Sequence, residues 1–108
     1  MNCEPDNLCS YILTMKRERV HLVIKGRVQG VCFRAGTRDK ALELNLKGWV
    51  KNSADGSVEA IFEGPKEQLN KAVRWCYKGP PGAGVTGVNE KWYDYTGEFD
   101  NFDIIFGY

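Results

Sequence analysis

Hydrophobic and polar positions alternate in the first patterned stretch of the chain, RVHLVIKGRV at 19–28. Val20, Leu22 and Ile24 occupy every second position of this stretch. Because successive side chains of a strand point to opposite faces, a period of two predicts a β-strand with one buried face. The β-branched residues of the stretch favour the same structure.

The period changes to that of a helix after residue 32. Apolar or small side chains then recur three or four positions apart, at Phe33, Thr37, Ala41 and Leu44. This spacing places them along one face of an α-helix. The dipeptide Lys47-Gly48 predicts that the helix ends there.

A hairpin is predicted in the next stretch, GWVKNSADGSVEAIFEG. Asp55-Gly56 is a strong turn signal between the strands WVKN and SVEAIFE. In the second strand, one face carries Val58, Ala60 and Phe62, and the other carries Ser57, Glu59, Ile61 and Glu63. The first face is therefore expected to meet the core.

A second helix and two more strands complete the pattern. Pro65 suits a first helical position, and the helical stripe that follows comprises Leu69, Ala72, Val73 and Cys76. KGPPGAG at 78–84 ends this helix, and the last strands are predicted at 85–95 and 101–107.

The predicted order is therefore β-α-β-β-α-β with an extra C-terminal strand. One-sided strands and amphipathic helices favour two layers, an antiparallel sheet with both helices on one face. This is the ferredoxin-like α+β arrangement. It hosts many functions, so the fold alone does not assign one.

Length and charge restrict the class of protein. A chain of 108 residues is expected to form one domain. Its formal net charge of +1 gives no general attraction for nucleic acid or an anionic membrane, and no apolar run approaches the roughly 20 residues that span a bilayer. Any anion binding must therefore be local.

The cysteines give no metal signature. Cys3, Cys9, Cys32 and Cys76 form no C-x-x-C pair, and His21 is the single histidine. We therefore expect no metal and no cofactor. Reduced thiols in a cytoplasmic protein are the preferred interpretation, and a disulfide involving Cys3 or Cys9 is the alternative that spacing leaves open.

The first residues, MNCEPDNLCSYILTM, lack the basic start and apolar core of a secretory signal. We interpret 1–17 as a disordered leader before a domain at 18–108. The product of an upstream start codon is the other interpretation of residues 1–15. Neither assigns any chemistry to them.

The loop KGRVQGVCFR at 25–34 carries the first candidate site. Gly26 and Gly30 permit backbone conformations that turn several N–H groups toward one point, where an anion can bind. Arg34 begins the following helix, and its planar guanidinium suits two phosphate oxygens. The alternative is that the glycines only turn the chain and Arg34 is solvated. The spacing is not that of a Walker A loop, so nucleotide binding is not implied.

Asn52 is the second candidate. If the first crossover is right-handed, the strands before and after it run parallel and end at the same edge of the sheet. Asn52 would then face the loop across one intervening strand, roughly 10 Å away. A phosphate with two side chains could fill that space. The alternative is structural, because asparagine is common beside turns.

The two motifs GRVQGVCFR and GWVKNSADGSVEA together resemble the acylphosphatase family, as do the later EGP and GPPGAGV. The resemblance covers about residues 18–107. It implies that Arg34 binds phosphate, that Asn52 positions the attacking water, and that the 28–33 backbone amides cradle the phosphate. The amide-bearing residues are Val28, Gln29, Gly30, Val31, Cys32 and Phe33.

The implied reaction hydrolyses an acyl phosphate, a small-molecule substrate, to a carboxylate and inorganic phosphate, which would also act as product or inhibitor. A carboxylate leaving group, with a pKa of about 4, departs without a general acid. We expect a substrate oxygen to take the proton of the water. We also expect a cytoplasmic monomer with broad substrate specificity and no nucleic-acid or membrane partner.

Three other functions compete with this interpretation. An RNA-binding module would need a basic-aromatic-glycine stretch, and none is present. An acylphosphatase-like domain also occurs in larger carbamoyl-transfer maturation proteins. The third is a sensor that has kept the site but lost turnover. The two intact motifs argue against a sensor.

Overall fold

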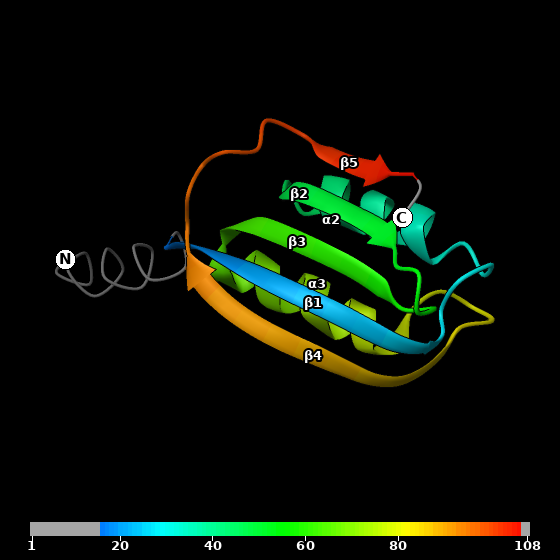
Figure 1. The fold of residues 1–108 in the computed structure, drawn as a ribbon. Coiled ribbons are helices and arrows are strands. Elements are labelled where there is room, and N and C mark those ends of the chain that lie inside the picture. The colour runs from blue at the N-terminus through cyan, green and yellow to red at the C-terminus, as the bar shows by residue number, and fades with distance from the viewer. Residues whose placement is uncertain (1–15, 107–108) are drawn as a thin grey trace, which may run out of the picture.

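The computed structural model describes residues 16–106. Its elements follow the predicted order, with the helices and strands shown in Figure 1. They are β1 (Arg17–Arg27), α2 (Phe33–Glu43), β2 (Lys47–Asn52), β3 (Val58–Pro65), α3 (Lys66–Lys78), β4 (Gly84–Asp94) and β5 (Phe102–Ile105). The predicted leader lies outside the described residues up to residue 15, and Arg17 already belongs to β1.

The five strands form one sheet in the order β4-β1-β3-β2-β5. β3 is antiparallel to both β1 and β2, so β1 and β2 run parallel with one strand between them, as predicted. The expectation of an antiparallel sheet is wrong at one edge, where β5 runs parallel to β2. The ferredoxin-like α+β class is confirmed, with a mixed sheet.

The parallel pairing follows from where β4 ends. Asp94, its last residue, lies beside Glu18 near the start of β1. The chain then crosses to the opposite edge of the sheet and enters β5 at Phe102, beside Gly48 near the start of β2 (Figure 1). A strand that starts at this end of the sheet must run in the direction of β1 and β2.

The core lies between the sheet and the two helices, which cover the same face (Figure 1). Val20, Leu22 and Ile24 of β1 are fully buried there, as their alternation predicts. Among the described residues, no helix is long and apolar enough to cross a membrane. Burial raises the pKa of the Cys76 thiol to about 12, so this cysteine is a neutral core residue. Cys3 and Cys9 lie outside the described residues.

The helix α2 ends earlier than predicted, at Glu43. Asn45 has a positive φ of 57°, and the amide of Leu46 donates to the carbonyl of Ala41 at 2.8 Å. This is the hydrogen-bond pattern of a Schellman cap, in which asparagine occupies the position that glycine usually takes. The sequence prediction relied on the later glycine and therefore missed the cap.

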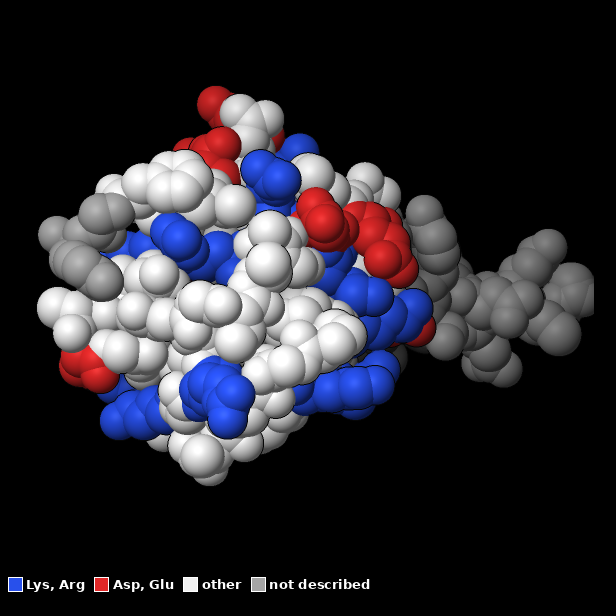
Figure 2. All heavy atoms as spheres, turned by 90° about the vertical axis from the view of Figure 1, so that its right-hand side faces the viewer, with Lys and Arg blue, Asp and Glu red and all other residues white. Residues whose placement is uncertain are grey.

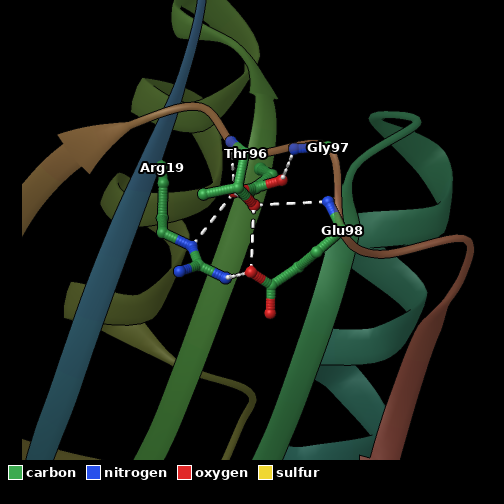
Figure 3. Close-up of polar contacts among 5 residues, drawn as sticks. Arg19, Thr96, Gly97 and Glu98 are labelled. Atoms are coloured by element: carbon green, nitrogen blue, oxygen red, sulfur yellow. Dashed lines mark hydrogen bonds and ion pairs between the residues drawn. The ribbon is translucent and has the colours of Figure 1, made fainter.

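A buried carboxylate of β3, Glu63, holds the crossing from β4 to β5 through Thr96 and Gly97, two residues labelled in Figure 3. Glu63 is 1% exposed, although its place in the strand pattern predicts the open face of the sheet. It accepts hydrogen bonds from the Thr96 amide, the Thr96 hydroxyl and the Gly97 amide at 2.8–3.0 Å. Nε of Arg19 on β1 lies 3.0 Å from Oε2 of Glu63, the oxygen that also accepts both bonds from Thr96. The crossing therefore covers this part of the open face.

Candidate active site

The loop between β1 and α2 has the backbone geometry of an anion-binding turn. Gly30 and Cys32 both have positive φ, 77° and 64°. Cys32 caps α2 without a side-chain hydrogen bond, and the first turn of α2 contains no acidic residue. The first amides of a helix have no partner within the helix and favour a negative charge. The loop is therefore able to receive an anion.

The strand before the loop requires a glycine at position 26. Gly26 has φ of 121°, and a Cβ built there would lie 2.2 Å from the carbonyl oxygen of Gly84 in β4. The register between β1 and β4 shifts at this residue. Such a bulge bends the strand. The bulge at Gly26 therefore sets the direction in which the chain leaves the sheet and enters the loop.

An open pocket of about 520 Å³ lies beside the loop. Its lining residues come from the loop, α2, the end of β2 and the end of β5: Val28, Gly30, Cys32, Phe33, Arg34, Ala35, Arg38, Asn52, Ile104 and Phe106. Both predicted catalytic residues, Arg34 and Asn52, are therefore brought to one pocket. Gln29 and Val31, which were also predicted to bind substrate, are not among the lining residues.

Arg34 has no acidic partner within residues 16–106. Its guanidinium lies over the ring of Phe106, 5.2 Å from the ring centroid. Among the described residues, the pocket lining contains no aspartate or glutamate. A cation at a helix N-terminus is unfavourable by about 0.3–1 kcal/mol. A bound anion would remove this cost.

Asn52 is the last residue of β2 and pairs with Val58 of β3. Its Oδ1 is buried and makes no hydrogen bond within the described part of the chain. The structural alternative predicts that the asparagine stabilises the following turn. In the hairpin it is Asp55 that does so, by accepting hydrogen bonds from the amide and hydroxyl of Ser57 at 3.0 and 2.6 Å. These bonds lower the pKa of Asp55 below its usual value, with that from the hydroxyl as the largest cause.

The side chain of Gln29 contacts the β2–β3 hairpin. Its Nε2 donates to the carbonyl oxygens of Ser53 and Ser57 at 2.8 and 2.9 Å. The loop that precedes Arg34 is thereby joined to the hairpin that follows Asn52. The Gln29 side chain thus joins the two halves of the site. The backbone amide of Gln29 remains a predicted phosphate ligand.

We expect Gln29→Met to destabilise the protein by about 1–3 kcal/mol, because two hydrogen bonds worth about 0.5–1.5 kcal/mol each are lost, while the carbonyls of Ser53 and Ser57 keep their backbone donors. It should also lower kcat by up to about 10²-fold, since small displacements of catalytic groups are costly. Chemical denaturation and steady-state hydrolysis of benzoyl phosphate measure the two effects. Gln68→Met on α3 is the control, expected to change stability by less than about 0.5 kcal/mol. Equal behaviour of the two variants would show that Gln29 does not join the loop to the hairpin.

Four lining residues were not predicted: Ala35, Arg38, Ile104 and Phe106. Arg38 lies four positions after Arg34, and helical spacing could have placed both on one face. No sequence signal could have placed Ile104 and Phe106, because they reach the pocket only through the parallel pairing of β5 with β2.

His21 lies on the open face of the sheet and does not line the pocket. Its Nε2 is 2.7 Å from Oε2 of Glu59 on the neighbouring strand β3. The arrangement agrees with a surface role for His21.

Figure 2 views the end of the molecule at which β1, β2 and β5 terminate in Figure 1. Basic side chains are spread across this face, and acidic ones lie mostly in its upper part. Although the net charge of the whole chain is only +1, the described residues that line the pocket include two arginines and no aspartate or glutamate. The positive potential is local, as the sequence requires.

Known proteins are similar to this chain in both sequence and fold. The acylphosphatase family profile matches residues 20–104. An acylphosphatase from Pelotomaculum thermopropionicum is 54% identical over 92 residues, which cover 85% of this chain and 100% of that protein. The structure of an acylphosphatase from Coxiella burnetii matches with 36% identity and a TM-score of 0.79, covering 83% of this chain and 94% of that one.

A longer protein contains a similar domain. The structure of T. kodakarensis HypF matches with 31% identity and a TM-score of 0.71, covering 82% of this chain but 12% of that one. The relatives therefore include a whole protein of this size and a small part of a much longer one.

Proposed function

The chain belongs to the acylphosphatase family and hydrolyses acyl phosphates, and we propose that Arg34 binds the phosphoryl group while Asn52 positions the attacking water. One observation carries this assignment. Within residues 16–106, the guanidinium of Arg34 has no acidic partner and the amide oxygen of Asn52 has no hydrogen bond, and both residues line the same pocket. An unpaired buried oxygen costs about 1–3 kcal/mol, and a partner in the pocket would remove that cost.

The proposed reaction transfers the phosphoryl group to water. The water oxygen forms a bond to phosphorus while the bond between phosphorus and the acyl oxygen breaks. The carboxylate leaves with the electron pair of that bond. The loose transition state needs mainly charge stabilisation and an in-line nucleophile. Arg34 and the amides of the 28–33 loop supply the first, and Asn52 supplies the second.

No protein base is assigned to this step. His21, the single histidine of the sequence, is occupied by Glu59 and does not line the pocket. We propose that a phosphate oxygen of the substrate accepts the proton of the water. We also propose that no metal takes part; within residues 16–106, no cluster of three metal-ligating side chains occurs.

We also propose a cellular compartment, an oligomeric state and a range of partners for the enzyme. We infer a cytoplasmic monomer without a nucleic-acid or membrane partner. The free thiols of Cys32 and Cys76 support a reducing compartment, and a net charge of +1 supports the absence of nucleic acid.

We expect Asn52→Ala to lower kcat by about 10²–10³-fold and to change KM only a few-fold. The reason is that the amide contacts the water rather than the substrate. Steady-state hydrolysis of benzoyl phosphate separates the two constants. Asn89→Ala, at an exposed position of β4, is the control and should behave as wild type. A rise in KM with unchanged kcat would assign Asn52 to substrate binding instead.

A further inference from the structure

Arg38 is a second cation in the pocket, and the proposed reaction does not use it. Arg34 and Arg38 lie one turn apart on α2 and both line the pocket. Residues four apart on a helix are neighbours on its surface. The Cα–Cβ bonds of a helix tilt toward its N-terminus, so Arg38 leans toward the phosphate loop.

The charge of Arg38 is scarcely compensated by the protein. Its only ion-pair contact within the described residues is with Asp39, at 3.9 Å between Nε and Oδ1. The two side chains are 45% and 74% exposed, and pairs between exposed side chains contribute little to stability. Two like charges one turn apart also destabilise a helix slightly. This arrangement makes Arg38 available to an anion.

The phosphoryl group already has its ligands. At neutral pH a phosphate group carries between one and two negative charges, which Arg34 and the loop amides would meet. The pocket lining also includes the apolar side chains of Ala35, Ile104 and Phe106. An acyl group lying against these side chains would extend from the phosphoryl site toward solvent. Its far end would then come within reach of Arg38.

We propose that Arg38 binds a second anionic group, carried by the acyl part of the substrate. The preferred substrates are then acyl phosphates whose acyl group bears a carboxylate or a second phosphate. This inference rests on the proposed function, and it replaces the expectation of broad specificity with a preference set by one residue.

The test compares benzoyl phosphate with 4-carboxybenzoyl phosphate, which share an aromatic acyl phosphate unit and differ by a carboxylate at the far end of the ring. Wild type should have the higher kcat/KM with the carboxylated substrate. In Arg38→Gln, the ratio of the two kcat/KM values should fall about three- to five-fold, mainly through KM. The fall should be smaller at high salt, where exposed charges are screened. A 4-phosphono analogue, compared in the same way, identifies which anion Arg38 prefers.

Arg74→Gln, at an exposed position of α3 outside the pocket, is the matched control and should keep the wild-type ratio. Equal losses on charged and neutral substrates in Arg38→Gln would mean that Arg38 acts on the phosphoryl group, and would overturn the inference. An unchanged ratio would overturn it as well. Failure of wild type to hydrolyse either substrate would instead reject the proposed function.

Discussion

Replacing Arg34 with alanine should lower kcat/KM for acyl phosphate hydrolysis by about 10³-fold or more. An arginine that stabilises the transferring phosphoryl group contributes about 10³–10⁵-fold to the rate of related reactions. Arg34 is the lining cation closest in sequence to the phosphate loop, and it has no carboxylate partner within residues 16–106. The loss should appear in both kcat and KM, because the same contact serves the ground state and the transition state.

The conservative variant sharpens the test. Arg34→Lys keeps the charge but loses the planar fork that binds two oxygens, so it should recover only part of the activity. Arg74→Ala on α3 controls for the loss of an exposed arginine. Inorganic phosphate should inhibit wild type and should bind Arg34→Ala more weakly. If Arg34→Ala retained more than about a tenth of wild-type kcat/KM, Arg34 would not be the principal phosphate ligand.

Replacing Glu63 with alanine should destabilise the protein by about 3–5 kcal/mol, because it removes a buried carboxylate that accepts three hydrogen bonds and pairs with Arg19. Glu63 is 1% exposed and accepts three hydrogen bonds from Thr96 and Gly97 while pairing with Arg19. Its removal would leave Arg19 without its buried partner and release the crossing segment that leads to β5. Chemical denaturation at neutral pH measures the loss.

Glu98 provides a matched control for Glu63. It pairs with the same arginine at 3.2 Å, but its side chain is 56% exposed. Glu98→Ala should therefore cost less than about 1 kcal/mol. Similar losses for the two variants would show that the buried carboxylate does not fasten the crossing. Glu63 lies five residues along β3 from Val58, the partner of Asn52, and does not line the pocket.

The elements could largely be predicted because hydrophobic periodicity determines which face of each is buried. The buried side chains of β1 follow its alternation, and those of α3 follow its helical stripe. Arg34 and Asn52 could be predicted to meet for a topological reason. A helical crossover makes β1 and β2 parallel, and parallel strands end at one edge.

Pairing between distant segments could not be predicted from the sequence. The parallel direction of β5 depends on the crossing of residues 95–101, and the burial of Glu63 depends on the same crossing. Alternation alone assigns Glu63 to solvent. Gln29 belongs to the phosphate motif, yet its side chain contacts the hairpin because two carbonyls lie within reach there. Arg38 could have been found from helical spacing, but only the pocket shows that its position matters.

The most direct test of the proposed mechanism is hydrolysis of benzoyl phosphate in ¹⁸O-labelled water, with EDTA present. If water attacks phosphorus at the Arg34 and Asn52 site, one labelled oxygen enters inorganic phosphate, none enters benzoate, and EDTA does not slow the reaction. Label in benzoate would place the attack on the acyl carbon. Loss of activity in EDTA would require a metal that the proposed site does not use. Either result would contradict the mechanism.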